Sequence, residues 1–203
     1  MIRNIIFDMG NVLLKFDRNL FLSRIDADEN AKILLNREVF ASFEWSMLDR
    51  GIISEEDALI RMKENIPKDL HKYADILVKS WDKLAEPVEG MADIVKELKS
   101  QGYGIYLLSN ASKKIYDYWN DIPGSEYFEG MIVSCDYKLV KPQNEIYHLF
   151  EDKFGLNLNE CLFIDDNGPN IEAAIYNGME GIVFHGDVDD LKKKLFAKGI
   201  LID

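Results

Sequence analysis

The sequence predicts an α/β protein, with a doubly wound, Rossmann-like parallel sheet and an inserted all-helical cap. Short apolar runs typical of buried parallel strands recur along the 203 residues. Amphipathic helical patterns separate most of these runs, and such alternation favours a parallel sheet with helices on both faces. One long interval near the N-terminus breaks the alternation, because it contains helical patterns and no convincing strand.

The expected strands are the apolar runs at residues 5–7, 104–108, 131–133, 162–164 and 181–184. The helical patterns between and after them include "EGMADIVKELKSQG", "QNEIYHLFEDKFG" and "NIEAAIYNG". Each of these patterns closes on glycine, the residue that most readily ends a helix. The last pattern, "DVDDLKKKLFAKG", begins with acids and ends with lysines, as the helix dipole favours.

The interval without a strand covers residues 17–86 and contains patterns such as "NLFLSRI", "AKILLNREVFASFEW" and "SEEDALIRMKENI". An insertion after the first strand lies above the carboxyl ends of the strands, where α/β proteins bind ligands. We therefore expect two domains, an α/β core of residues 1–16 plus 87–203 and a helical cap of residues 17–86.

The composition argues against a nucleic-acid or membrane partner. The formal net charge is −12, whereas nucleic acids and anionic membranes attract basic surfaces, and no apolar run approaches the ~20 residues of a bilayer span. A small anionic substrate is not excluded, because a local cation can outweigh the global field. Cys135 and Cys161 lack metal-ligand spacing and indicate buried thiols in a reducing compartment. We expect a cytoplasmic protein, and nothing in the sequence predicts its oligomeric state.

Acidic residues follow two of the expected strands, at the point where each strand ends. Asp8 comes directly after the first apolar run, and Asp165 and Asp166 follow the run at residues 162–164. Asp8 alone could cap a turn, helped by the flexible pair Gly10 and Asn11, and one acid of the pair Asp165 and Asp166 could cap a helix. Two adjacent like charges are nevertheless costly without a cation, and an oxygen-rich site suits Mg²⁺. The acidic pair therefore favours a metal site.

Two further motifs offer groups that bind anions. Ser109 and Asn110 follow the run at residues 104–108 with a hydroxyl and an amide, which can hold a phosphate oxygen. Lys141 precedes Pro142, so its backbone is extended just before a helix begins, and its charge can neutralise an anion there. In isolation, a helix N-cap accounts better for Ser109 and Asn110, and a solvated lysine for Lys141. The motifs are more informative together than apart.

The order and spacing of the four motifs resemble those of the haloacid dehalogenase (HAD) superfamily. The stretches "FDMGNVL", "LLSN", "KPQNEIYH" and "FIDDNGPNIEAA" are similar to subfamily IA, which has a C1-type helical cap, and within it to bacterial sugar phosphatases related to alpha-D-glucose-1-phosphate phosphatase. The likeness covers essentially the whole chain. It implies a Mg²⁺-dependent phosphatase that hydrolyses a small phosphorylated metabolite, with a sugar phosphate as the leading substrate class.

The resemblance implies a role for each motif residue. Asp8 would be the nucleophile that attacks phosphorus and forms an aspartyl-phosphate, which water then hydrolyses. The carboxylates of Asp8 and Asp166 and the backbone carbonyl of Gly10 would bind Mg²⁺, which would stabilise the charge of the transition state.

The remaining motif residues would bind the phosphoryl group or support the site. The hydroxyl of Ser109 and the backbone amide of Asn110 would hold the phosphoryl oxygens. Lys141 would neutralise the phosphoryl group and position the nucleophile. Asp165 would be oriented toward Lys141, and Asn170 would support the loop.

At Gly10 the chain departs from the family pattern. Family phosphatases usually have a second Asp at this position, which gives a proton to the leaving group and then takes one from water. Gly10 keeps a carbonyl but transfers no proton, and losing a positioned acid or base typically costs ~10²–10⁴-fold in rate. Asp17 could substitute, although a helix cap is the favoured interpretation of Asp17.

The sequence leaves two other functions open. A metal-independent 2-haloacid dehalogenase also uses a nucleophilic Asp without the second Asp, but its chemistry gives no reason for the pair Asp165 and Asp166. A catalytically impaired HAD fold that serves as a binding protein would explain Gly10. It would not explain why Asp8, Lys141 and both acids of the pair are retained.

Overall fold

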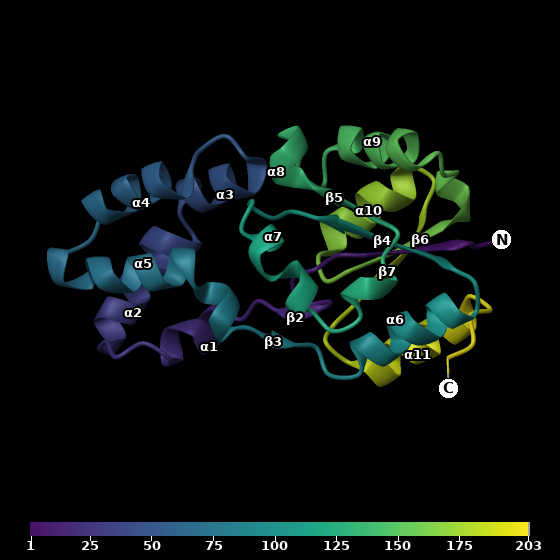
Figure 1. Ribbon diagram of the computed structural model, residues 1–203, viewed down its shortest axis with the longest axis horizontal. Coiled ribbons are helices and arrows are strands. Elements are labelled where there is room, and N and C mark those ends of the chain that lie inside the picture. Colours follow the sequence, from purple (N-terminus) through teal and green to yellow (C-terminus); the bar gives the residue numbers. More distant parts are fainter. Residues whose placement is uncertain (203) are drawn as a thin grey trace.

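The computed structural model describes residues 1–202, which form a five-stranded sheet in the order β5-β4-β1-β6-β7 and a separate two-stranded sheet (Figure 1). All neighbouring strands of the larger sheet are parallel. Its strands are β1 (Asn4–Phe7), β4 (Gly104–Ser109), β5 (Gly130–Val133), β6 (Cys161–Asp165) and β7 (Glu180–Val183). Each expected strand is confirmed to within one residue at either end, and so is the parallel α/β class.

Helices cover both faces of the larger sheet (Figure 1). Ile5 and Phe7 of β1 belong to the apolar cluster on the face covered by α6 and α11, whereas Ile6 belongs to the cluster under α9 and α10. Because successive side chains of a strand point to opposite faces, β1 is buried on both sides and holds its carboxyl end rigidly. The covering helices are α6 (Met91–Ser100), α9 (Asn144–Phe154), α10 (Gly168–Tyr176) and α11 (Val188–Ala197).

The strand order determines where ligands can bind. The chain passes from β1 to β4 and β5 on one side and then to β6 and β7 on the other. A reversal of this kind opens a crevice beyond the carboxyl ends of the strands. The N–H of Asp8 donates to the carbonyl of Ile164 at 2.9 Å, so the residue after β1 stays aligned with the end of β6. The polar residues that end these strands therefore meet at one edge of the sheet.

A helical cap lies to one side of the α/β core (Figure 1). The chain leaves the core through β2 (Leu14–Lys15) and returns through β3 (Glu86–Pro87), which pair as antiparallel strands. Within the described residues, no helix has the length and apolar character needed to cross a membrane. The helices of the cap are α1 (Arg18–Ser23), α2 (Glu29–Leu35), α3 (Phe43–Arg50), α4 (Glu55–Glu64) and α5 (His71–Lys79). The inserted helical cap is thus confirmed, and its bounds at residues 17 and 86 stay a prediction.

The helical pattern at residues 31–45 is not one continuous helix. It divides into α2, a π-helical turn (Asn36–Phe40) and the start of α3. Ser42 causes the last break, because its Oγ accepts the N–H of Trp45 at 3.1 Å and caps the new helix. The break brings the rings of Phe40 and Trp45 together, with 5.1 Å between their centroids, on the wall of the cavity described below.

The core and the cap meet directly where α3 lies beside α8 (Ser134–Tyr137), the short helix after β5 (Figure 1). Gly51, which ends α3, has a left-handed φ of +71°. A Cβ at this position would lie 2.0 Å from the carbonyl oxygen of Cys135, so only glycine permits this approach. The end of α3 is therefore seated on the core.

Candidate active site

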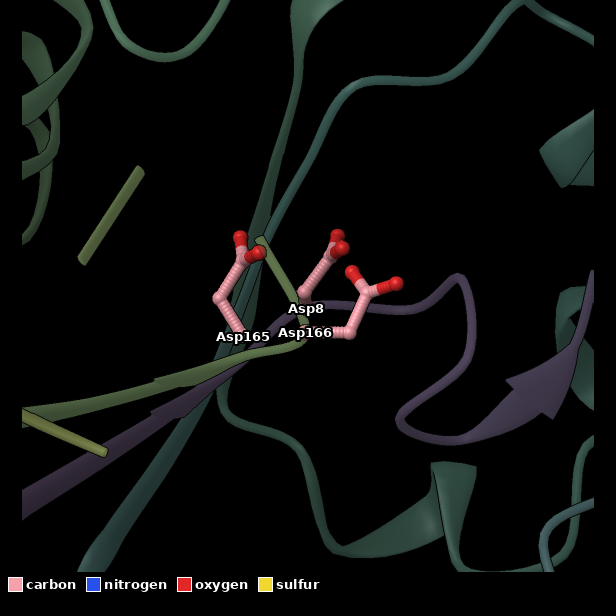
Figure 2. Close-up of side chains that lie close together, drawn as sticks. All are labelled: Asp8, Asp165 and Asp166. Atoms are coloured by element: carbon pink, nitrogen blue, oxygen red, sulfur yellow. The ribbon is translucent and has the colours of Figure 1, made fainter. Parts of the chain in front are cut away.

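Three carboxylates gather at the carboxyl ends of β1 and β6 and point toward one another (Figure 2). Asp8 follows β1, Asp165 is the last residue of β6, and Asp166 comes next. One oxygen from each carboxylate lies within 4.8 Å of the other two. Asp165 is fully buried, and Asp8 is only 8% exposed. Burial raises the pKa of Asp8 to about 6, against the opposing charge of Lys141.

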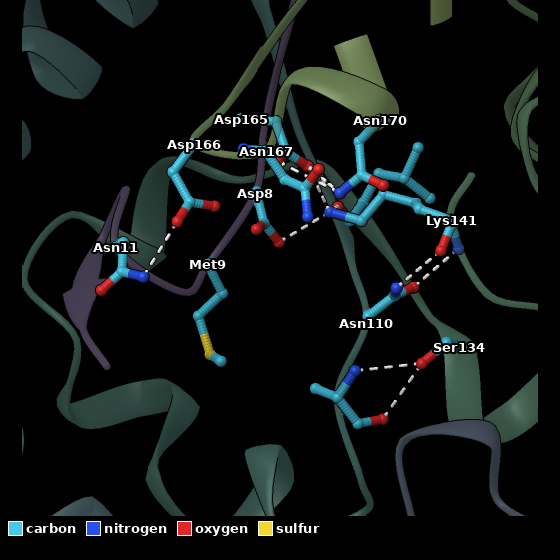
Figure 3. A network of polar contacts seen from close by, with 12 residues as sticks. Asp8, Met9, Asn11, Asn110, Ser134, Lys141, Asp165, Asp166, Asn167 and Asn170 are labelled. Atoms are coloured by element: carbon cyan, nitrogen blue, oxygen red, sulfur yellow. Dashed lines mark hydrogen bonds and ion pairs between the residues drawn. The ribbon is translucent and has the colours of Figure 1, made fainter. Parts of the chain in front are cut away.

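Lys141 is the buried cation of this cluster (Figure 3). Its Nζ lies 2.8 Å from Oδ1 of Asp8, 2.7 Å from Oδ2 of Asp165 and 2.9 Å from the carbonyl oxygen of Leu108. The ammonium donates hydrogen bonds to Asp165 and to the carbonyl of Leu108, and its charge forms an ion pair with Asp8. Burial alone would lower the pKa of Lys141, but the two carboxylates raise it above its ordinary value. Lys141 is therefore a fixed positive charge.

Both oxygens of the Asp165 carboxylate accept hydrogen bonds from groups of the protein itself. Besides the ammonium of Lys141, its oxygens accept the side-chain amide of Asn170 at 3.0 and 3.2 Å and the backbone N–H of Asn167 at 2.7 Å. The hydroxyl of Tyr147 donates to the carbonyl of Asn170 at 2.8 Å and anchors the start of α10. A buried carboxylate with donors on both oxygens positions its neighbours rather than binding a ligand.

Asp166 is more accessible than Asp165. Its Oδ2 accepts Nδ2 of Asn11 at 2.9 Å, while Oδ1 of Asn11 accepts the N–H of Phe16 at 2.9 Å. Burial, reinforced by the charge of Asp165, raises the pKa of Asp166. The sequence indicated Asn11 only as a turn residue. Its left-handed φ of 56° is the property that makes asparagine suitable there, and this conformation aims its amide at Asp166.

The cluster fits a divalent cation. Its three carboxylates and one ammonium leave two negative charges uncompensated when all are ionised. Because Asp165 is saturated, Asp8 and Asp166 are the acids whose oxygens remain available. The backbone at Gly10 is unobstructed, since a Cβ there would meet nothing closer than Cβ of Phe16 at 4.0 Å. Oxygen ligands of this kind suit Mg²⁺.

Ser109 and Asn110 end β4 beside the cluster. The Oγ of Ser109 is buried and lacks a hydrogen-bond partner among residues 1–202. Buried hydroxyls are normally paired, so this one would be satisfied by a ligand oxygen. The side chain of Asn110 accepts the N–H of Lys141 at 2.8 Å and donates to its carbonyl at 3.0 Å (Figure 3). These two bonds tie the backbone of Lys141 to the end of β4.

A cavity of about 360 Å³ lies between the cluster and the cap. Asp8, Gly10 and Asp166 contribute to its core side. Asp17 is not among its lining residues, and its side chain instead accepts the N–H groups of Asn19 and Leu20 at the start of α1. The cap side combines aromatic, aliphatic and small polar residues with a few charges; its aromatic and charged lining residues are Phe16, Arg18, Phe40, Trp45, Asp49, Glu55 and Trp81.

Asp49, on α3, is a cavity residue that the sequence did not indicate. Burial, followed by the nearby charge of Asp8, raises its pKa to about 8, although Arg18 and the backbone N–H of Ser112 oppose this rise. A pKa raised in this way favours the protonated carboxyl near neutral pH. An acid near the end of an amphipathic helix is typical of a solvent-exposed face, so no local sequence signal identifies it.

Comparisons with known proteins agree with this architecture. Residues 2–178 match the family described as haloacid dehalogenase-like hydrolase. The chain is 25% identical to the sesquiterpene phosphatase astK of Aspergillus oryzae over 87% of each protein. It is also 27% identical to the (S)-2-haloacid dehalogenase of Pseudomonas sp. strain YL, over 88% of this chain and 80% of that enzyme.

A solved structure extends the likeness to three dimensions. The wild-type HAD family enzyme bt-2542 of Bacteroides thetaiotaomicron, in complex with magnesium and inorganic phosphate, superimposes with a TM-score of 0.72. The two proteins are 22% identical, and the match covers 94% of this chain and 99% of that one. At this identity the likeness shows a shared fold.

Proposed function

The chain belongs to the haloacid dehalogenase-like hydrolases, and we propose that it is a Mg²⁺-dependent phosphatase that acts on a small phosphorylated metabolite through an aspartyl-phosphate on Asp8. The observation that carries this proposal is the charge of the cluster. Three carboxylates lie close together with one fixed ammonium, which contacts two of them, and when ionised they leave a deficit of two positive charges that a divalent cation would supply. The magnesium and phosphate bound to bt-2542 support the same interpretation.

The residues of the chain divide the reaction between them. A carboxylate oxygen of Asp8 attacks phosphorus, and the P–O bond to the leaving group breaks; water then attacks the phosphorus and frees Asp8. Lys141 holds Asp8 and neutralises the incoming phosphoryl group, while Asp165 holds Lys141. The hydroxyl of Ser109 and the backbone N–H of Asn110 hold phosphoryl oxygens.

Asp8, Asp166 and the carbonyl of Gly10 would hold Mg²⁺, which when bound supplies positive charge to the transferring phosphoryl group. Asn11 orients Asp166 through the hydrogen bond between them. Asn170 supports this arrangement indirectly, since it fixes the Asp165 carboxylate.

The leading substrate class in this proposal is a sugar phosphate, selected by a cap of residues 17–86. The cavity of about 360 Å³ is of a size that holds a small metabolite. Arg18 and Ser42 line its cap side and can bind hydroxyl groups, while Trp45 and Trp81 offer flat apolar surfaces. The similarity of the motifs to bacterial sugar phosphatases favours the same class.

A 2-haloacid dehalogenase is the second candidate. Gly10 and the likeness to the Pseudomonas dehalogenase favour it. It gives no reason for the uncompensated charge around Asp8, because that chemistry uses no metal. The phosphatase therefore accounts for more of the site.

The decisive assay is phosphate release from a panel of phosphorylated metabolites, with and without Mg²⁺, by wild type and Asp8→Asn. We expect Mg²⁺-dependent release by wild type and none by the variant. Release that is unchanged in Asp8→Asn would contradict the proposal. Metal-free halide release from 2-chloropropionate would establish the dehalogenase instead, and a metabolite bound without turnover would indicate a binding protein.

A further inference from the structure

We propose that Asp49, on the cap helix α3, is the general acid and base of the phosphatase and supplies the proton transfer that Gly10 lacks. This inference rests on the proposed function. It concerns how the leaving group is protonated, which the core residues described above leave unassigned.

The backbone around Asp49 is fixed to the catalytic core. The Oγ of Ser134 donates to the carbonyl of Asp49 and accepts the N–H of Ala111 at 3.0 Å. Ala111 directly follows Ser109 and Asn110, so one hydroxyl joins the cap helix to the phosphate-binding end of β4. Gly51 adds the close contact with the backbone of Cys135 described above. Asp49 is therefore held by the core although it belongs to the cap.

The side chain of Asp49 lines the same cavity as Asp8. Arg18 and Ser112 line this cavity as well. Asp8 is the charge that raises its pKa most, after burial itself. The titratable groups that interact electrostatically with Asp49 come from several elements. They are Asp8 after β1, Arg18 on α1, Tyr118 on α7 (Ile115–Tyr118) and Cys135 on α8.

The other acids near the cavity are less suited to this role. Asp17 caps α1 and is absent from the cavity lining. Glu55 does line the cavity, but the charges that act on it are those of Lys114, Asp117, Lys79 and Asp82, not that of Asp8. Asp165 and Asp166 are committed to Lys141 and to the metal site. Asp49 is thus the acid that lines the cavity from the cap while its backbone is fixed to the core beside the phosphate-binding end of β4.

The proposed proton transfers balance over the two half-reactions. As Asp8 forms a bond to phosphorus, the bond from phosphorus to the ester oxygen breaks, and that oxygen takes the proton of Asp49 and leaves as an alcohol. The Asp49 carboxylate then accepts a proton from the water that attacks the aspartyl-phosphate. Phosphate departs, Asp8 is again a carboxylate, and Asp49 is again protonated.

The first test compares two phosphate esters that differ in their need for protonation. 4-Nitrophenyl phosphate releases 4-nitrophenolate, which is a stable anion, whereas the alkoxide leaving group of a simple alkyl phosphate needs a proton. Asp49→Asn should reduce kcat/KM for the alkyl ester by ~10²–10⁴-fold and that for the nitrophenyl ester by less than about tenfold. Retained nitrophenyl activity also shows that the variant is folded. Equal losses for both esters, or no loss for the alkyl ester, would overturn the proposal.

Asp17→Asn is the matched control, since it removes a carboxyl at the entrance of the cap and leaves an amide oxygen that can cap α1. It should retain wild-type activity on both esters. A selective loss on the alkyl ester in Asp17→Asn, with Asp49→Asn unaffected, would transfer the role to Asp17 and overturn the proposal. Wild-type protein that cleaves neither these esters nor the metabolite panel would instead contradict the phosphatase function itself.

The second test restores an acid at the position where the family usually has one. A Cβ at Gly10 would meet only Cβ of Phe16 at 4.0 Å, so Gly10→Asp can be accommodated. In the Asp49→Asn background, we expect Gly10→Asp to raise kcat/KM for the alkyl ester at least tenfold and to change the nitrophenyl activity little. A double variant no more active on the alkyl ester than Asp49→Asn would contradict the proposal.

Discussion

The core side and the cap side of the cavity are built in opposite ways. On the core side, Lys141 donates hydrogen bonds to Asp165 and the carbonyl of Leu108 and forms an ion pair with Asp8, while both oxygens of Asp165 accept hydrogen bonds. On the cap side, Phe16 packs edge-on against Trp81 at 5.0 Å between centroids, and single charges such as Arg18 line the cavity from separate helices. A closed charge network tolerates few changes, whereas aromatic and isolated polar groups can vary. In the proposed reaction, the nucleophile and the metal site therefore belong to the core, whereas the cap supplies the substrate contacts and the acid Asp49.

The largest expected effect comes from breaking the core network. Lys141→Met leaves Asp8 and Asp165 buried without their shared cation, which should lower the free energy of unfolding by ~3–5 kcal/mol and abolish phosphate release. Lys99→Met is the control, because Lys99 pairs with Glu129 on the surface and such pairs contribute ~0–1 kcal/mol. Urea unfolding of both variants measures the difference. Equal losses of stability in the two variants would contradict the expected difference between a buried charge network and a surface ion pair.

The next effect concerns the charge deficit of the core. Mg²⁺ at about one hundred times its dissociation constant should stabilise the wild-type protein by ~2.7 kcal/mol, because the folded state binds it and the unfolded state does not. Asp166→Asn should lose most of this stabilisation, while Asp121→Asn, at an exposed acid outside the cluster, should keep it. Thermal unfolding with and without Mg²⁺ reports the change. Full stabilisation of Asp166→Asn would show that the metal binds elsewhere.

The last of these predictions concerns the cap side of the cavity. The folded state holds the Asp49 proton up to pH about 8, whereas the unfolded chain releases it near the ordinary value of 3.8. Between these values the unfolded state binds fewer protons, so this carboxyl makes stability fall as pH rises. Asp49→Asn lacks the effect. Its melting temperature relative to wild type, in metal-free buffer, should therefore rise steadily from pH 4 to pH 8, and a constant difference would contradict the buried, protonated carboxyl.

The contrast between core and cap also explains which site residues could be predicted from the sequence. Asp8, Ser109 and Asp165 could be located because each ends or follows an apolar run, and the parallel sheet brings such ends together. The role of Asn11 could not be predicted, since its hydrogen bond to Asp166 depends on a left-handed backbone conformation. Asp49 could not either, because its environment results from the contact of α3 with α8, which no local pattern encodes.

The helical pattern at residues 31–45 shows the same limit within the cap. Its apolar periodicity continues through Ser42, but the capping bond of this serine divides it into separate elements. Periodicity indicates the helical state well, whereas the ends of helices depend on single hydrogen bonds. The orientation of the cap helices around the cavity therefore follows only once the ends of those helices are known.

The most direct test of the account is the covalent state of Asp8 during turnover. Wild-type protein is mixed with a substrate found in the metabolite panel and Mg²⁺, quenched in acid within one turnover and digested for mass spectrometry. The account predicts that the peptide containing Asp8 carries the added mass of one phosphoryl group, and that Asp8→Asn or omission of Mg²⁺ abolishes it. Turnover at the wild-type rate with this peptide unmodified at every quench time, or with the phosphoryl group on another residue, would contradict it.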